Sequence, residues 1–164
     1  MKTTIWIFCA LLFVPFVLQA QSPAVTNFFD RYEGIEAYNS INFGGSLLGM
    51  ISKDDNDSNI KLKSLKLINA PYNEGPINGT AINRFITSLE NGRFEELDVE
   101  NTGSGSIQFF MDEQGGMIKE LVMVLQSETG YTVMSLRGLI PLDELEKLDA
   151  EVDIDGLEHL EGPY

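Results

Sequence analysis

The chain has 164 residues with 25 acidic side chains against 11 basic ones, and its formal net charge of −14 argues against ligands recognised through a phosphate backbone. Nucleic-acid binding depends on lysine and arginine neutralising phosphates, so nucleic acid is not expected as a partner. An anionic membrane surface is disfavoured for the same reason. The length suits one domain, and ten Phe and five Tyr residues favour one well-filled core.

Residues 1–20 have the pattern of a secretory signal peptide. Lys2 supplies the positive n-region, residues 5–18 form an apolar run, and Ala20 puts a small residue at the expected cut. We therefore expect the mature chain to begin at Gln21 and to be periplasmic or secreted, with no stable membrane insertion after cleavage.

The alternative for this segment is a transmembrane anchor, but the run is short for about 30 Å of hydrocarbon. Cys9, the only cysteine, lies inside the run and follows Ile7 and Phe8 rather than the small residues of a lipid-attachment box. Cleavage would leave no cysteine for a disulfide, a nucleophile or a metal site.

Helical periodicity predicts three helices, at 24–33, 80–91 and 142–149. The first two carry apolar residues at i, i+3, i+4 and i+7: Val25, Phe28, Phe29 and Tyr32, then Ile82, Phe85, Ile86 and Leu89. Asn78 or Thr80 caps the second helix, and Asn91-Gly92 is expected to end it with a left-handed residue. Pro141 precedes the third. A weaker pattern suggests a short helix at 47–51.

Period-two patterns predict strands elsewhere. Residues 35–43 are expected to be extended, and 60–68 form a strand with a possible bulge at Ser64, followed by a loop over 69–76. Four later segments form a meander because short glycine-bearing turns separate them: 94–99, 106–112, 117–126 and 131–140.

One alternating face of this meander is expected to pack on the helices. In the strand 117–126, either Leu121, Met123 and Leu125 or Val122 and Val124 then line the core. The economical arrangement is a two-layer α+β fold with all helices on one face of a mostly antiparallel sheet. Residues 21–150 form this single domain, and 151–164 form an acidic tail that is partly docked.

Several segments together resemble the domain of unknown function 4252, a family of small exported proteins typical of Bacteroidota. They are Phe28–Glu33, Ile118–Val124, Tyr131–Gly138, the helix from Pro141 to Leu148, and the closing Asp155–Leu160. The resemblance covers most of the mature chain. It implies a Gram-negative periplasmic setting and no established activity, so it supplies no catalytic residue.

Two acidic stretches invite a calcium interpretation. In Asp54–Asn59 the carboxylates and amides alternate, but the glycine and the final glutamate of a calcium loop are missing, where Ile60 and Lys66 stand. Glu151, Asp153, Asp155 and Gly156 come closer, yet Gly162 occupies the final position. We predict no metal residues, and any calcium affinity millimolar or weaker.

The sequence also gives little support for a catalytic or phosphate-binding site. His159 is the only histidine, and no nucleophile elbow supports a partnership with any of the serines Ser40, Ser46, Ser104, Ser106 and Ser135. The paired carboxylates are Glu95-Glu96, Asp112-Glu113 and Asp143-Glu144, and adjacent residues on a strand point to opposite faces. Gly44-Gly45 and Gly115-Gly116 fit turns better than phosphate loops. We predict no catalytic or cofactor-binding residues.

The sequence therefore favours a non-catalytic binding or interaction module of the cell envelope, with an unknown protein or small molecule as its partner. Two other functions stay open. One is an envelope-polymer hydrolase that uses acidic residues, which requires two facing carboxylates across a cleft. The other is a weak divalent-cation-binding module.

Overall fold

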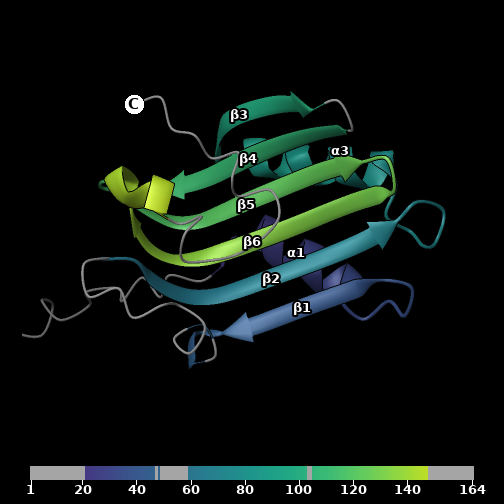
Figure 1. The fold of residues 1–164 in the computed structure, drawn as a ribbon, viewed down its shortest axis with the longest axis horizontal. Coiled ribbons are helices and arrows are strands. Elements are labelled where there is room, and N and C mark those ends of the chain that lie inside the picture. Colours follow the sequence, from purple (N-terminus) through teal and green to yellow (C-terminus); the bar gives the residue numbers. More distant parts are fainter. Residues whose placement is uncertain (1–20, 47, 49–58, 103–104, 148–164) are drawn as a thin grey trace, which may run out of the picture.

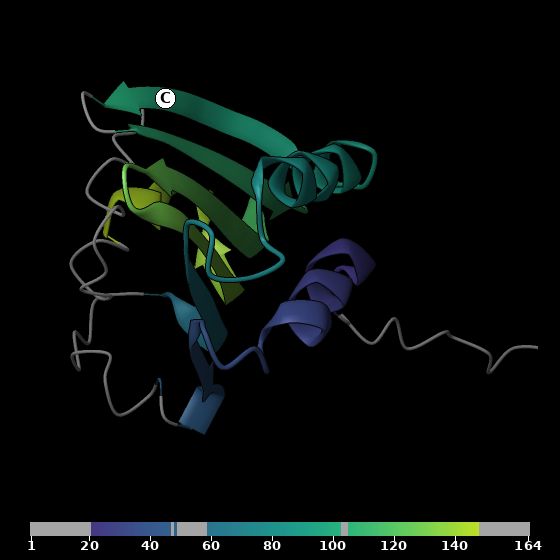
Figure 2. The same cartoon turned by 90° about the vertical axis from the view of Figure 1, so that its right-hand side faces the viewer.

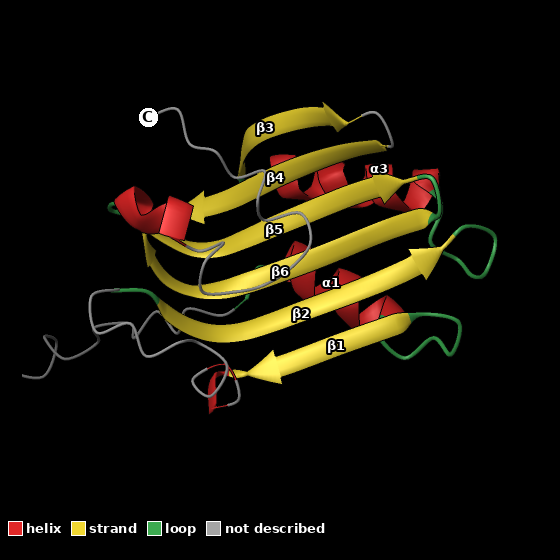
Figure 3. Ribbon diagram, viewed as in Figure 1, coloured by secondary structure: helices red, strands yellow, loops and turns green. Residues whose placement is uncertain are grey.

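The computed structural model describes residues 21–46, 48, 59–102 and 105–147, and within them the chain forms an α+β fold (Figures 1 and 3). Six strands make one antiparallel sheet in the order β1-β2-β6-β5-β4-β3. The strands are β1 (Asn39–Gly44), β2 (Lys61–Pro71), β3 (Glu95–Thr102), β4 (Gly105–Glu113), β5 (Met117–Ser127) and β6 (Gly130–Pro141). The helices whose full extent the structure describes are α1 (Pro23–Tyr32), α3 (Gly79–Glu90) and a 3₁₀ helix, η1 (Leu142–Lys147).

Strands β3 to β6 pair with their sequence neighbours, and β2 then pairs with β6 so that β5 and β6 lie in the middle of the sheet. A register shift between Leu62 and Ser64 confirms the bulge. The expected loop from Asn69 is wrong in its first residues, because β2 continues to Pro71 and pairs there with Gly130.

The two α-helices form where local signals agree. Proline occupies the first turn of α1, and the side chain of Asn78 caps α3 by accepting a hydrogen bond from the N–H of Ala81 at 3.0 Å. The predicted left-handed end of α3 is wrong: Asn91 is right-handed, and Gly92 is not among the described glycines with positive φ.

Both faces of the sheet are buried. The helices α1 and α3 cover one face of the sheet (Figure 2). The cluster beneath them includes Val122 and Val124 of β5, whereas Leu121 and Met123 belong to the second cluster, on the other face. All four residues are at most 2% exposed. The expectation that only one phase of this strand lines the core is therefore wrong, because β5 is a central strand with apolar residues against both of its faces.

The third helix also differs from the expectation. Residues 142–147 form a 3₁₀ helix, and its Leu145 packs in the cluster opposite α1 and α3, so the helices do not all share one face. The N–H of Leu142 donates to the carbonyl of Gly116 at 3.1 Å, and the Glu144 carboxylate accepts two hydrogen bonds from Asn59. These contacts direct the chain away from the α-helical layer.

Several expectations fall outside the described residues. They concern the signal peptide at 1–20, most of the helix at 47–51, the loop at 54–58 and the tail at 151–164; Gly45, Ser46 and Leu48 are helical. Among the residues that are described, none of the helices has the length and apolarity needed to cross a membrane.

Candidate functional site

A groove runs between α1 and α3. It encloses about 210 Å³, and its lining combines three aromatic residues with two arginines. The lining residues are Ala24, Asn27, Phe28, Arg31 and Tyr32 of α1 and Ala81, Arg84, Phe85 and Ser88 of α3.

Aromatic side chains form the floor of this groove. The rings of Phe28 and Phe85 lie 4.3 Å apart between centroids with a tilt of 30°, and Tyr32 meets Phe28 edge-on at 4.9 Å. These three residues are at most 9% exposed. Packing against the core therefore holds the floor rigid, and such rings present apolar surface with little further loss of side-chain entropy.

Two arginines stand over this floor. Arg31 lies in the last turn of α1, Arg84 lies on α3, and both are exposed. Between described side chains the ion pairs are Lys66 with Glu33 at 3.8 Å and Arg93 with Asp112 at 2.7 Å, so neither groove arginine is neutralised by a carboxylate of the described chain. In a protein of net charge −14 this is a local site of positive charge.

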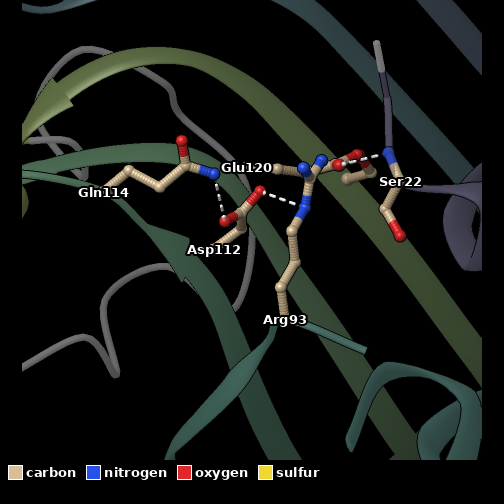
Figure 4. A network of polar contacts seen from close by, with 6 residues as sticks. Ser22, Arg93, Asp112, Gln114 and Glu120 are labelled. Carbon is tan, nitrogen blue, oxygen red and sulfur yellow. Dashed lines mark hydrogen bonds and ion pairs between the residues drawn. The ribbon is translucent and has the colours of Figure 1, made fainter. Parts of the chain in front are cut away.

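A second group of polar residues lies between the sheet and the helical layer. Asp112 of β4 and Glu120 of β5 are direct partners in the strand register, and each is 1% exposed (Figure 4). Like charges directly opposite on neighbouring strands destabilise a sheet, so both groups need compensating partners.

Asp112 obtains its compensation from an ion pair. Its Oδ2 atom lies 2.7 Å from the Nε of Arg93, which follows α3, and its Oδ1 accepts a hydrogen bond from Gln114 at 3.1 Å (Figure 4). The arginine side chain is half exposed while the aspartate is buried, so the pair anchors the end of the α3 layer to β4.

Glu120 is compensated mainly by neutral donors. The backbone N–H of Ser22 donates to its Oε2 at 3.1 Å, and the hydroxyl of Ser135 donates to its Oε1 at 2.8 Å. Burial raises the pKa of Glu120, while these hydrogen bonds, the Gln21 side chain and the charge of Arg137 oppose that rise.

These two carboxylates do not form an accessible acid pair. Neither residue lines the groove, and both are 1% exposed with their oxygens engaged by protein groups. A glycosidase needs its acids on opposite sides of a substrate cleft, whereas these lie side by side on one sheet face. The placement supports a structural role.

The other candidate residues are spread over the molecule. Glu95 and Glu96 are exposed on the edge strand β3, and Gly115 and Gly116 adopt positive φ in the β4–β5 turn, as glycine turns require. Of the candidate serines that the structure describes, Ser135 donates a hydrogen bond to a buried carboxylate, that of Glu120. His159, Ser104 and the acidic stretches 54–58 and 151–156 lie outside the described residues. In the described part, no group of three potential metal ligands is found.

Sequence reasoning did not identify Glu120, Arg31 or Arg84. A signal existed for Glu120, because it is a charged residue next to the continuous apolar run that begins at Leu121. For the arginines there was none, since an arginine on a helix surface is ordinary.

Comparison with known proteins identifies one family. The model of a domain of unknown function (DUF4252) matches residues 32–148, from the last residue of α1 to just beyond η1. No curated protein and no solved structure matches the chain.

Proposed function

Since the chain belongs to the DUF4252 family, whose description assigns no activity, we propose from its geometry that it is a non-catalytic interaction module. Its binding site is the groove between α1 and α3, and its ligand is an acidic segment of a partner protein. The observation that carries this proposal is the pair Arg31 and Arg84 above a rigid aromatic floor.

The size of the groove favours a protein segment over a drug-sized ligand. Its volume of about 210 Å³ is below the roughly 300–1,000 Å³ typical of small-molecule sites, but it accommodates one apolar side chain of a partner. Arginine and aromatic residues are also the types enriched at protein interfaces and among their energetic hot spots.

Charge favours an acidic partner segment. An approaching carboxylate meets two guanidinium groups that no described carboxylate neutralises, and Arg can bind carboxylates in a bidentate geometry. Asn27 at the groove can hydrogen-bond to an extended backbone, and the Ser88 hydroxyl, which donates to the Phe85 carbonyl at 2.6 Å, can still accept a hydrogen bond.

The proposed setting is the cell envelope. The signal-peptide pattern of residues 1–20 and the resemblance to exported proteins support export, with cleavage after Ala20. N-terminal sequencing of the exported protein tests this location separately from the binding site.

A peptide titration tests the binding site. The probes are two fluorescent decapeptides with one central leucine, one flanked by aspartate and glutamate and one flanked by lysine. We expect saturable binding of the acidic peptide alone, with an affinity that weakens as salt rises because exposed charges are screened over about 10 Å at 0.1 M. Arg31→Gln combined with Arg84→Gln should lower the affinity at least about tenfold.

The matched control is Lys61→Gln combined with Lys63→Gln, which removes the same charge at exposed positions outside the groove. It should leave the affinity within about twofold. Ser88→Trp, which fills the groove without changing charge, should also abolish binding. Equal loss in both double variants, or unchanged binding in Ser88→Trp, would show that net charge rather than the groove governs the interaction.

A further inference from the structure

The contact between Ser22 and Glu120 places the start of the described chain on a buried carboxylate. The Ser22 N–H donates to Glu120 across 98 positions of sequence, and the two residues are 5% and 1% exposed. Figure 4 shows this N–H pointing at the carboxylate from the segment that precedes α1. Ser22 lies two residues after Ala20, so this contact is next to the expected cleavage site.

Gln21 lies against the same carboxylate. Its side-chain Nε2 is buried without a hydrogen bond of normal geometry, and the proximity of this side chain lowers the pKa of Glu120. The backbone nitrogen of Gln21 is only about 3–4 Å from that of Ser22, as standard backbone dimensions require. Because the Ser22 nitrogen is 3.1 Å from Oε2 of Glu120, a charge on the Gln21 nitrogen would lie within about 7 Å of that oxygen.

We propose that removal of residues 1–20 creates an α-ammonium group at Gln21 that forms a buried ion pair with Glu120, so that processing itself stabilises the domain. This inference rests on the proposed cleavage after Ala20, but not on the proposed ligand of the groove. In the unprocessed chain the Gln21 nitrogen is a neutral amide, whereas after cleavage it is a cation beside an acid that only neutral donors contact directly.

The charged and polar groups around Glu120 are compatible with an ion pair to the Gln21 amine. Asp112 lies opposite it on β4 and is already paired with Arg93. On β6, Ser135 donates a hydrogen bond, and Arg137, which is paired with Glu120 in the strand register, contributes a positive charge. Before α1, Ser22 and Gln21 complete the environment. The carboxylate thus has no direct cationic partner among the described side chains.

The test compares purified chains that differ only at the N-terminus. One begins at Gln21, one retains Ala20 and so moves the ammonium by one residue, and one begins at Gln21 with an acetylated amine. Each is made with Glu120 and with Glu120→Gln, and unfolding by urea is followed by circular dichroism. Apart from the substitution at Glu120, all six chains contain every described residue.

We expect the folding equilibrium constant of the chain with a free Gln21 amine to exceed those of the other two by about ten- to a hundredfold, the range typical of a close charge pair. The advantage should disappear in Glu120→Gln. The advantage should be complete below about pH 8, the pKa of the amine in unfolded chains, and should be lost as the pH rises through the higher pKa of the paired amine, where the cation deprotonates.

Equal stability of the three N-termini with Glu120 present would overturn the proposal, even if Glu120→Gln did not fold. An advantage that survives Glu120→Gln would also overturn it, because another group would then be responsible. Both outcomes are independent of the peptide titration, so failure of the ion pair and failure of the groove are distinguishable.

Discussion

Replacing Tyr38 by phenylalanine removes one hydroxyl that joins the two helical segments. The Tyr38 Oη accepts a hydrogen bond from the backbone N–H of Ile77 at 2.7 Å, which connects the turn after α1 to the segment before α3. The two residues are 7% and 3% exposed, so water does not reach the amide readily when the hydroxyl is absent.

The expected cost follows from the unpaired amide. Removing one partner of a buried hydrogen bond costs about 1–3 kcal/mol, and Tyr38→Phe adds no cavity term because the ring remains. For a domain of this size each kcal/mol lowers the Tm by about 3–6 °C, so we expect a decrease of about 3–18 °C.

Calorimetry measures the change in Tm, and hydrogen exchange should show faster exchange of the Ile77 amide. The control is Tyr32→Phe, because the Tyr32 hydroxyl makes no hydrogen bond within the described part of the chain. If Tyr38→Phe were no less stable than Tyr32→Phe, the reasoning that this hydroxyl satisfies a buried amide would be refuted.

Three further predictions concern backbone space, the buried ion pair and pH. Gly75→Ala should lower the Tm, because the added Cβ would overlap the Tyr38 ring. Gly34→Ala is the control, since its Cβ would lie in open space and the Tm should change little. Thermal melts of both variants test this. Arg93→Ala should cost about 1–3 kcal/mol in urea unfolding, since it leaves a buried carboxylate without its cation. In the unprocessed chain burial raises the pKa of Glu120, so its ionisation lowers the free energy of unfolding at high pH, and this cost vanishes below the unfolded pKa near 4.3. Relative to the unprocessed chain with Glu120, the Glu120→Gln variant should therefore be more stable at pH 7 than at pH 4. A difference in stability that does not depend on pH would contradict this.

The helices and most strands were predictable because their signals are local. The stripes at Val25–Tyr32 and Ile82–Leu89, together with the cap at Asn78, predict α1 and α3 within a residue or two of their bounds. The bulge near Ser64 was visible as a phase change in the apolar pattern. The α+β class followed from these elements without knowledge of the strand order.

Burial on both faces was less predictable. Leu121 to Val124 is a continuous apolar run, which is typical of a strand covered on two sides, but alternation around it favoured a one-sided sheet. The position of η1 depended on contacts such as that of Leu142 with Gly116, which only the fold brings together.

The candidate sites depend on long-range contacts and were not predictable. The groove requires α1 and α3 to lie side by side, although more than 45 positions separate their first residues. Ser22 meets Glu120 across 98 positions. Composition and periodicity describe each residue in its own segment, so they cannot show that an arginine from each helix overhangs one groove.

The groove and the N-terminal contact share α1, and this links the two proposals. Ser22 is the residue before α1, so its hydrogen bond to Glu120 fixes where that helix enters the helical layer, and α1 carries Arg31, one of the two groove arginines. A stronger contact at Gln21 should hold this wall of the groove more firmly and reduce the entropy lost when a ligand binds. The acidic peptide should therefore bind more tightly to the chain that begins at Gln21 than to the chain that retains Ala20. Equal affinities would show that the two sites act independently, even if each exists.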